Sequence, residues 1–103
     1  PVEEANSDAF ASRNSGIMHA CGHDMHTAVL LGALAVLNTN KKDITGTLFG
    51  LFQPVEEVWP GGASLVLQEE PFLGYDVKAV VGEHVDPELP TGTFGFRPGM
   101  YMA

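Results

Sequence analysis

Three of the four histidines and the only cysteine of the chain fall within the eight residues from His19 to His26. Cys21 and His23 stand two positions apart in this stretch. A thiolate and an imidazole are ligands that zinc prefers, and both also accept manganese, cobalt or nickel. The clustering therefore predicts a metal site, to which other segments must add ligands. The alternative is a small buried thiol next to an imidazole that caps a helix.

A pair of acids, Glu56-Glu57, directly follows a strand-like run that stops at Pro54. Because neighbouring side chains diverge at the end of a strand, one carboxylate can bind a metal while the other faces the water on that metal. The metal lowers the pKa of water toward about 7, and the free carboxylate carries the proton to a leaving amine. This pair predicts hydrolysis, whereas Glu3-Glu4 and Glu69-Glu70 are expected to be solvated surface.

His84 stands alone at the end of a second buried, strand-like run. A histidine in such a place is more often a hydrogen-bonded structural residue, but its expected position near the acids favours a metal ligand. His19, Asp24 and His26 are interpreted as groups that support the ligands or cap a helix. The reason is that a ligating imidazole usually donates its other N–H to a carboxylate or a carbonyl.

Helical and strand-like segments alternate along the chain, which is typical of an α/β layer fold with parallel strands. The first helix is apolar nearly all round, so we expect it to be buried on most sides, with His23 or Asp24 as its cap. Ligands of open α/β sheets bind at the carboxyl ends of the strands, where Glu56-Glu57 and His84 are expected to converge. The expected elements are an extended entry over 16–23, a helix over 24–38, a strand over 45–53, a helix over 63–70, and strands over 77–82 and 91–97.

Composition restricts the class of protein. The 103 residues suffice for one small domain with a modest core. Five basic and thirteen acidic side chains give a net charge of −8, which argues against nucleic acid or an anionic membrane as a partner. A single cysteine cannot form an internal disulfide, which fits a reducing compartment or a thiol reserved for metal, and we expect a cytoplasmic location. No apolar run of about 18 residues and no signal peptide are present, and a start at Pro1 indicates a piece of a longer chain.

Five short motifs follow one another along the chain. In order and spacing they resemble the amidohydrolase branch of the aminoacylase/carboxypeptidase metallopeptidases. That branch includes bacterial N-acyl-amino-acid amidohydrolases, hippurate hydrolases, N-acetyl-diaminopimelate deacetylases and plant auxin-conjugate hydrolases. The motifs are His19-Ala20-Cys21-Gly22-His23-Asp24, Gln53-Pro54-Val55-Glu56-Glu57, Gly61-Gly62-Ala63, Glu83-His84-Val85 and Leu89-Pro90-Thr91-Gly92.

The resemblance implies a three-layer α/β/α zinc-peptidase-like catalytic domain with a mostly parallel sheet. It implies two divalent metal ions, zinc first and manganese, nickel or cobalt as alternatives, with Cys21 bridging them. Glu56 would be the general base. The substrate would be an N-acyl amino acid or a related conjugate, and the parent protein a homo-oligomer. By the same likeness the metal ligands would be Cys21, His23, Glu57 and His84.

The chain also departs from the family pattern, because family members are several times longer. They carry an Asp-x-Asp-type motif before this region, a further metal-binding histidine near the C-terminus, and a lid or dimerisation domain that would begin just after Met102. Residues 1–103 are therefore expected to be the central part of a catalytic domain, close to inactive alone. Two alternatives stay open: a noncatalytic metal-binding or scaffold module, and a piece that folds by pairing strand edges with another copy.

Overall fold

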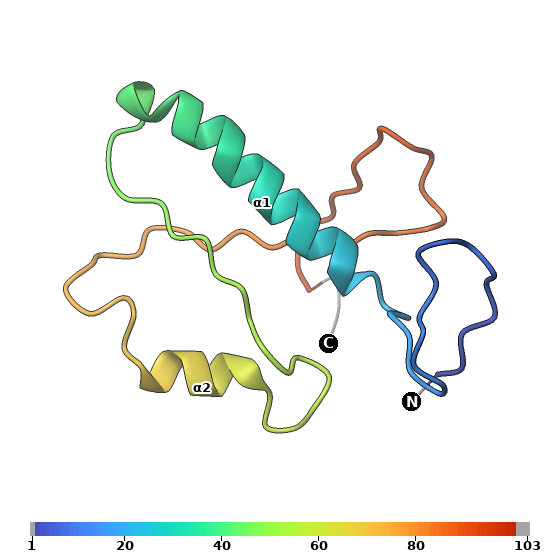
Figure 1. Cartoon of the computed structure of the whole chain (residues 1–103). Coiled ribbons are helices and arrows are strands. Elements are labelled where there is room, and N and C mark those ends of the chain that lie inside the picture. The colour runs from blue at the N-terminus through green and yellow to red at the C-terminus, as the bar shows by residue number, and fades with distance from the viewer. Residues whose placement is uncertain (1, 101–103) are drawn as a thin grey trace.

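The computed structural model describes residues 2–100. Within this range, long irregular segments flank and connect two α-helices and one short 3₁₀ helix (Figure 1). The elements are α1 (His23–Thr39), η1 (Lys41–Asp43) and α2 (Gly62–Gln68). Pro1 and residues 101–103 lie outside the described part, as does the point after Met102 where a lid domain is expected. Neither α-helix of residues 2–100 has the length and hydropathy to cross a membrane.

Helix α1 confirms the helix predicted over 24–38 to within one residue at each end. Its body is rich in alanine and leucine, which are strong helix formers. The cap was predicted wrongly: α1 begins after Gly22, whose φ of 80° is left-handed, and neither His23 nor Asp24 occupies the cap position. At the other end the Asn40 side-chain amide donates to the Val36 carbonyl at 3.0 Å, which satisfies an orphan acceptor of the last turn.

Helix α2 confirms the second predicted helix, which was expected over 63–70. It begins at Gly62, the only buried residue among residues 2–100. A Cβ atom placed on Gly62 would lie 1.5 Å from the carbonyl oxygen of Pro54, so only glycine fits this contact. The start of α2 is therefore packed directly against the chain that leads to the two adjacent acids.

The predicted strands over 45–53, 77–82 and 91–97 are not formed within residues 2–100. These segments run as irregular chain without a paired neighbour (Figure 1). A strand exists only through hydrogen bonds to an adjacent strand, and none of these segments has such a partner in the described chain. The parallel sheet of the expected α/β fold is thus absent from this part of the molecule, although its sequence pattern is present.

The expected modest core is also absent from the described residues, because no hydrophobic side chain there is buried. Helix α1 buries none of its residues, contrary to the expectation that it is covered on most sides. Large apolar side chains face solvent instead, among them Val81 and Phe96, which are 92% and 93% exposed. The radius of gyration of 16.7 Å exceeds the roughly 13 Å of a compact domain of this length. Local contacts rather than a core hold the elements of residues 2–100.

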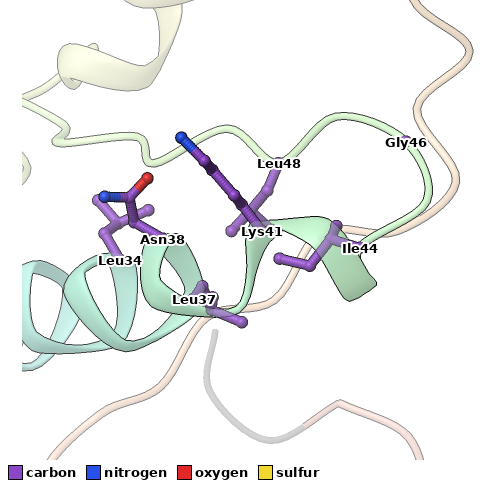
Figure 2. A pocket seen from close by; sticks show the side chains of 7 residues that line it. All are labelled: Leu34, Leu37, Asn38, Lys41, Ile44, Gly46 and Leu48. Atoms are coloured by element: carbon purple, nitrogen blue, oxygen red, sulfur yellow. The ribbon is translucent and has the colours of Figure 1, made fainter.

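One of these contacts orients the chain that leads to the acids. A Cβ atom on Gly50 would lie 2.5 Å from Cδ1 of Leu34, so the 45–53 segment passes directly over α1. Further along α1, the apolar side chains of Leu34 and Leu37 line a hollow with Ile44 and Leu48 (Figure 2). The other residues that line this hollow are Asn38, Lys41 and Gly46, so it contains no histidine, cysteine or acid.

Candidate metal centre

The thiol of Cys21 and the imidazole of His84 meet although 63 positions separate them in sequence. Cys21 Sγ lies 3.3 Å from His84 Nε2. The ring of His23, at the start of α1, completes this group: one ligand atom from each of Cys21, His23 and His84 lies within 4.8 Å of the others. The structure therefore brings together three of the four side chains predicted to bind metal.

Both acids of the Glu56-Glu57 pair approach the same histidine. His23 Nε2 lies 3.7 Å from Glu56 Oε2 and 3.7 Å from Glu57 Oε1. These three residues form a second group whose ligand atoms all lie within 4.8 Å of one another. His23 is half-buried and common to both groups, while the two acids are 56% and 66% exposed. Five candidate side chains thus converge from three separated segments.

The loop that presents the acids is closed by its own backbone. The carbonyl of Val55 accepts the N–H groups of Val58 and Gly62 at 3.4 and 3.3 Å. Val55 has a φ of 52°, a left-handed conformation that a β-branched residue rarely adopts. The close packing of Gly62 on Pro54 holds the chain in this turn. Such strain is typical of functional loops, and no pattern in the sequence predicts it at Val55.

The tautomer of His84 follows from its partners. Its Nδ1 lies 2.7 Å from the Val85 carbonyl, which can only accept a hydrogen bond, so Nδ1 carries the proton. In the neutral imidazole Nε2 is then the acceptor, and this atom faces the sulfur of Cys21. A ligating imidazole was expected to donate its second N–H to a carboxylate or carbonyl, and the Val85 carbonyl has this role for His84.

The environment of Cys21 raises the pKa of its thiol. Desolvation by neighbouring groups is the largest cause, followed by the negative charge of Glu57, a hydrogen bond to Glu57 and the charge of Glu56. The residue itself remains exposed. The acids disfavour the thiolate until a cation offsets their charge, so metal binding and loss of the thiol proton are coupled here.

The donor set fits a divalent cation. Thiolate, imidazole and carboxylate are the three ligand types found in zinc sites, at about 2.0–2.3 Å from the metal, so two ligands of one tetrahedral ion lie about 3.3–3.8 Å apart. The separations of 3.3 Å from Cys21 to His84 and 3.7 Å from His23 to each acid are of this size. A hollow lined by Ala20, Cys21, Gly22, His84, Val85, Asp86 and Pro87 adjoins the first group.

The three residues predicted to support the ligands lie in different surroundings. His26 accepts the N–H of Val85 at Nε2 and packs beside His84. Asp24 lies in the first turn of α1, where a carboxylate interacts favourably with the helix dipole. Among the contacts described for residues 2–100, neither Asp24 nor His19 bonds to a candidate ligand, so their support stays a prediction.

The sequence matches peptidase family M20/M25/M40 over residues 1–101, and the chain belongs to this family. It is 45% identical to an N-acyl-L-amino acid amidohydrolase of Geobacillus stearothermophilus over the whole chain and 27% of that protein. It is also 45% identical to an N-acetyl-L-cysteine deacetylase and 43% identical to an N-acetylcysteine deacetylase, both of Bacillus subtilis, again over the whole chain. These matches confirm the resemblance to the amidohydrolase branch. No solved structure matches the chain.

The chain spans about a quarter of the length of these relatives, namely 27%, 24% and 26%. Membership of the family implies an α/β peptidase fold, which the described residues do not display by themselves. Peptidases of this family generally use divalent metals, and the two groups around His23 offer suitable ligands for them.

Proposed function

We propose that the chain is the central part of a metal-dependent amidohydrolase that cleaves the amide bond of an N-acyl amino acid. The observation that carries this proposal is the convergence on His23 of a thiol, a second imidazole and two carboxylates. The names of the relatives, which refer to N-acyl amino acids and N-acetylcysteine, support the substrate class.

Cys21, His23, Glu57 and His84 would hold two divalent cations, zinc first, with manganese, nickel or cobalt acceptable to the same donors. When bound, the cations lower the pKa of water and polarise the amide carbonyl. Cys21 is the better shared ligand, because a thiolate sulfur can bind two ions whereas His23 presents only Nε2 to the acids. A reducing, cytoplasmic location would keep this thiol available for metal.

Glu56 and Glu57 would divide the work between them. Glu57 influences the thiol of Cys21 more strongly than Glu56 does, through both charge and a hydrogen bond, which supports Glu57 as the ligand. Glu56, whose charge affects the thiol less, is left free to accept the proton of the attacking water and deliver it to the amide nitrogen. A C–O bond forms as the C–N bond breaks, and the products are a carboxylate and an amine.

The test is the pair of variants Glu56→Gln and Glu57→Gln in the longer protein that we propose contains this chain. Glu56→Gln should lower kcat by about 100-fold or more while the bound metal is retained. Glu57→Gln should lose metal as well as activity. Metal content by elemental analysis and turnover of acetyl-amino acids measure both effects. Equal metal loss in the two variants would contradict the division of roles, and unaltered turnover in Glu56→Gln would remove the proposal of Glu56 as the base.

The isolated chain of residues 1–103 should hydrolyse acetyl- or benzoyl-amino acids at a rate close to the uncatalysed one, since further groups expected from the family lie outside it. Measurable turnover by this chain, absent from a Glu56→Gln control, would refute this part of the proposal.

A further inference from the structure

His26 contacts the loop of His84 although it belongs to no candidate ligand group. It lies on α1 three positions after His23, hence on the same face of the helix, and its ring centroid is 5.3 Å from that of His23. Its Nε2 lies 3.1 Å from the backbone nitrogen of Val85, and its ring meets the ring of His84 edge-on at 4.4 Å. His26 therefore connects the helix that carries His23 to the loop that carries His84.

The direction of this hydrogen bond defines what His26 can do. A backbone N–H only donates, so Nε2 of His26 is the acceptor and its lone pair is used by Val85. That nitrogen is not free to bind a cation. The role of His26 therefore differs from that of His23 and His84, whose Nε2 atoms face the other candidate ligands.

Val85, whose N–H donates to His26, has a second contact with Gly22. A Cβ atom on Gly22 would lie 2.5 Å from Cγ2 of Val85, so the backbone before α1 packs directly against this side chain. Val85 is thus held by its N–H at His26 and by its side chain at Gly22. Its carbonyl in turn accepts the Nδ1–H of His84 and orients that ring.

We infer that His26 is a positioning residue that fixes the distance between the Cys21–His23 segment and His84 by anchoring the N–H of Val85. The inference rests on the proposed function, because it gives His84 the role of a metal ligand. Besides the bond to His26, three contacts described for residues 2–100 hold the 84–85 loop against the 21–23 segment: Val85 packs on Gly22, the His84 imidazole meets the Cys21 thiol, and the His84 ring faces the His23 ring edge-on.

The experiment compares His26→Ala, His26→Gln and His26→Asn in the longer protein loaded with Co²⁺, an ion whose sulfur charge-transfer and d–d bands report thiolate and imidazole ligation. His26→Ala should weaken Co²⁺ affinity by about 10–100-fold and alter the d–d bands. Glutamine can place its amide oxygen near the position of Nε2 and should restore most of the affinity, whereas the shorter asparagine should not. Asn38→Ala, at the far end of α1, is the matched control and should bind Co²⁺ like the unaltered protein.

Amide hydrogen exchange at Val85 in the metal-free protein gives an independent readout. It should accelerate at least about tenfold in His26→Ala and return toward the original rate in His26→Gln, by analogy with the loss of one local hydrogen bond. Unchanged Val85 exchange together with unchanged Co²⁺ affinity in His26→Ala would overturn the inference. If the alanine variant does not fold, equal Co²⁺ affinity and equal Val85 exchange in His26→Gln and His26→Asn would overturn it. Failure of the unaltered protein to bind Co²⁺ would refute the proposed function, whereas Val85 exchange would still test the anchor.

Discussion

Replacement of Gly22 by alanine tests the packing at the start of α1 most sharply. The residue has a φ of +80°, which costs an L-residue about 1–2 kcal/mol. The new Cβ would also lie 2.5 Å from Cγ2 of Val85, and such overpacking costs about 1–3 kcal/mol. Gly74→Ala is the matched control, since its φ is +84° and nothing lies within 4 Å of the added Cβ. We therefore expect Gly22→Ala to lose about 1–3 kcal/mol more than Gly74→Ala.

The contribution of the contact can be isolated by a double-mutant cycle with Val85→Ala. The smaller side chain removes the overlap but not the backbone strain, so the double variant should recover about 1–3 kcal/mol of the loss caused by Gly22→Ala. Urea unfolding of the metal-free longer protein measures each term from the midpoint at constant m-value. A coupling energy below about 0.5 kcal/mol, or equal losses in Gly22→Ala and Gly74→Ala, would refute the packing of Gly22 on Val85.

Three further perturbations have defined outcomes. Gly62→Ala should destabilise the protein by about 3 kcal/mol or more in urea unfolding, because its Cβ would overlap the Pro54 carbonyl, and a loss below about 1 kcal/mol would contradict that contact. Because the pKa of the Cys21 thiol is raised, a cation must displace the thiol proton, and Zn²⁺ affinity measured by chelator competition should rise with pH by up to about tenfold per unit. The metal-free protein should lose stability as pH rises through this raised pKa. A Zn²⁺ affinity that does not change with pH would refute the coupling between metal binding and loss of the thiol proton. The backbone N–H groups of Asn6 and Ser12 donate to the carboxylate of Glu4 and lower its pKa. Protonation of Glu4 weakens these bonds, so amide exchange at Ser12, corrected for intrinsic rates, should accelerate as pH falls through the lowered pKa. In Glu4→Gln this exchange should already be fast at neutral pH.

The helices could be predicted because their signals are local. The alanine- and leucine-rich run of α1 and the Gly61-Gly62 break before α2 act within a few residues of the elements they define. The strands could not be predicted from local signals in this way, because a strand depends on a partner elsewhere in the chain. The β-branched run over 77–82 has the composition of a buried strand, but a strand forms only when a partner supplies hydrogen bonds, and no such partner lies within the described chain. Burial likewise depends on what covers Val80 and Val81, which are 90% and 92% exposed.

The candidate site could be predicted in its residue types but not in its backbone. Cys21, His23 and the acids could be singled out because thiolate, imidazole and carboxylate are the ligand types of zinc sites, and the structure brings these side chains close together. The left-handed turn at Val55 and the hydrogen bonds of Val85 are main-chain features, which valine side chains do not indicate. Gly22 could have been noticed in the sequence, because a glycine between two candidate ligands indicates that another chain segment packs closely on the backbone there. In the structure the side chain of Val85 packs on Gly22.

X-ray absorption at the zinc edge of the zinc-loaded longer protein tests the central claim most directly. The account predicts a sulfur atom at about 2.3 Å and nitrogen or oxygen atoms at about 2.0–2.2 Å from zinc. The sulfur contribution should disappear in Cys21→Ser. A zinc shell without sulfur in the unaltered protein, or one whose sulfur persists in Cys21→Ser, would contradict a metal centre built on Cys21.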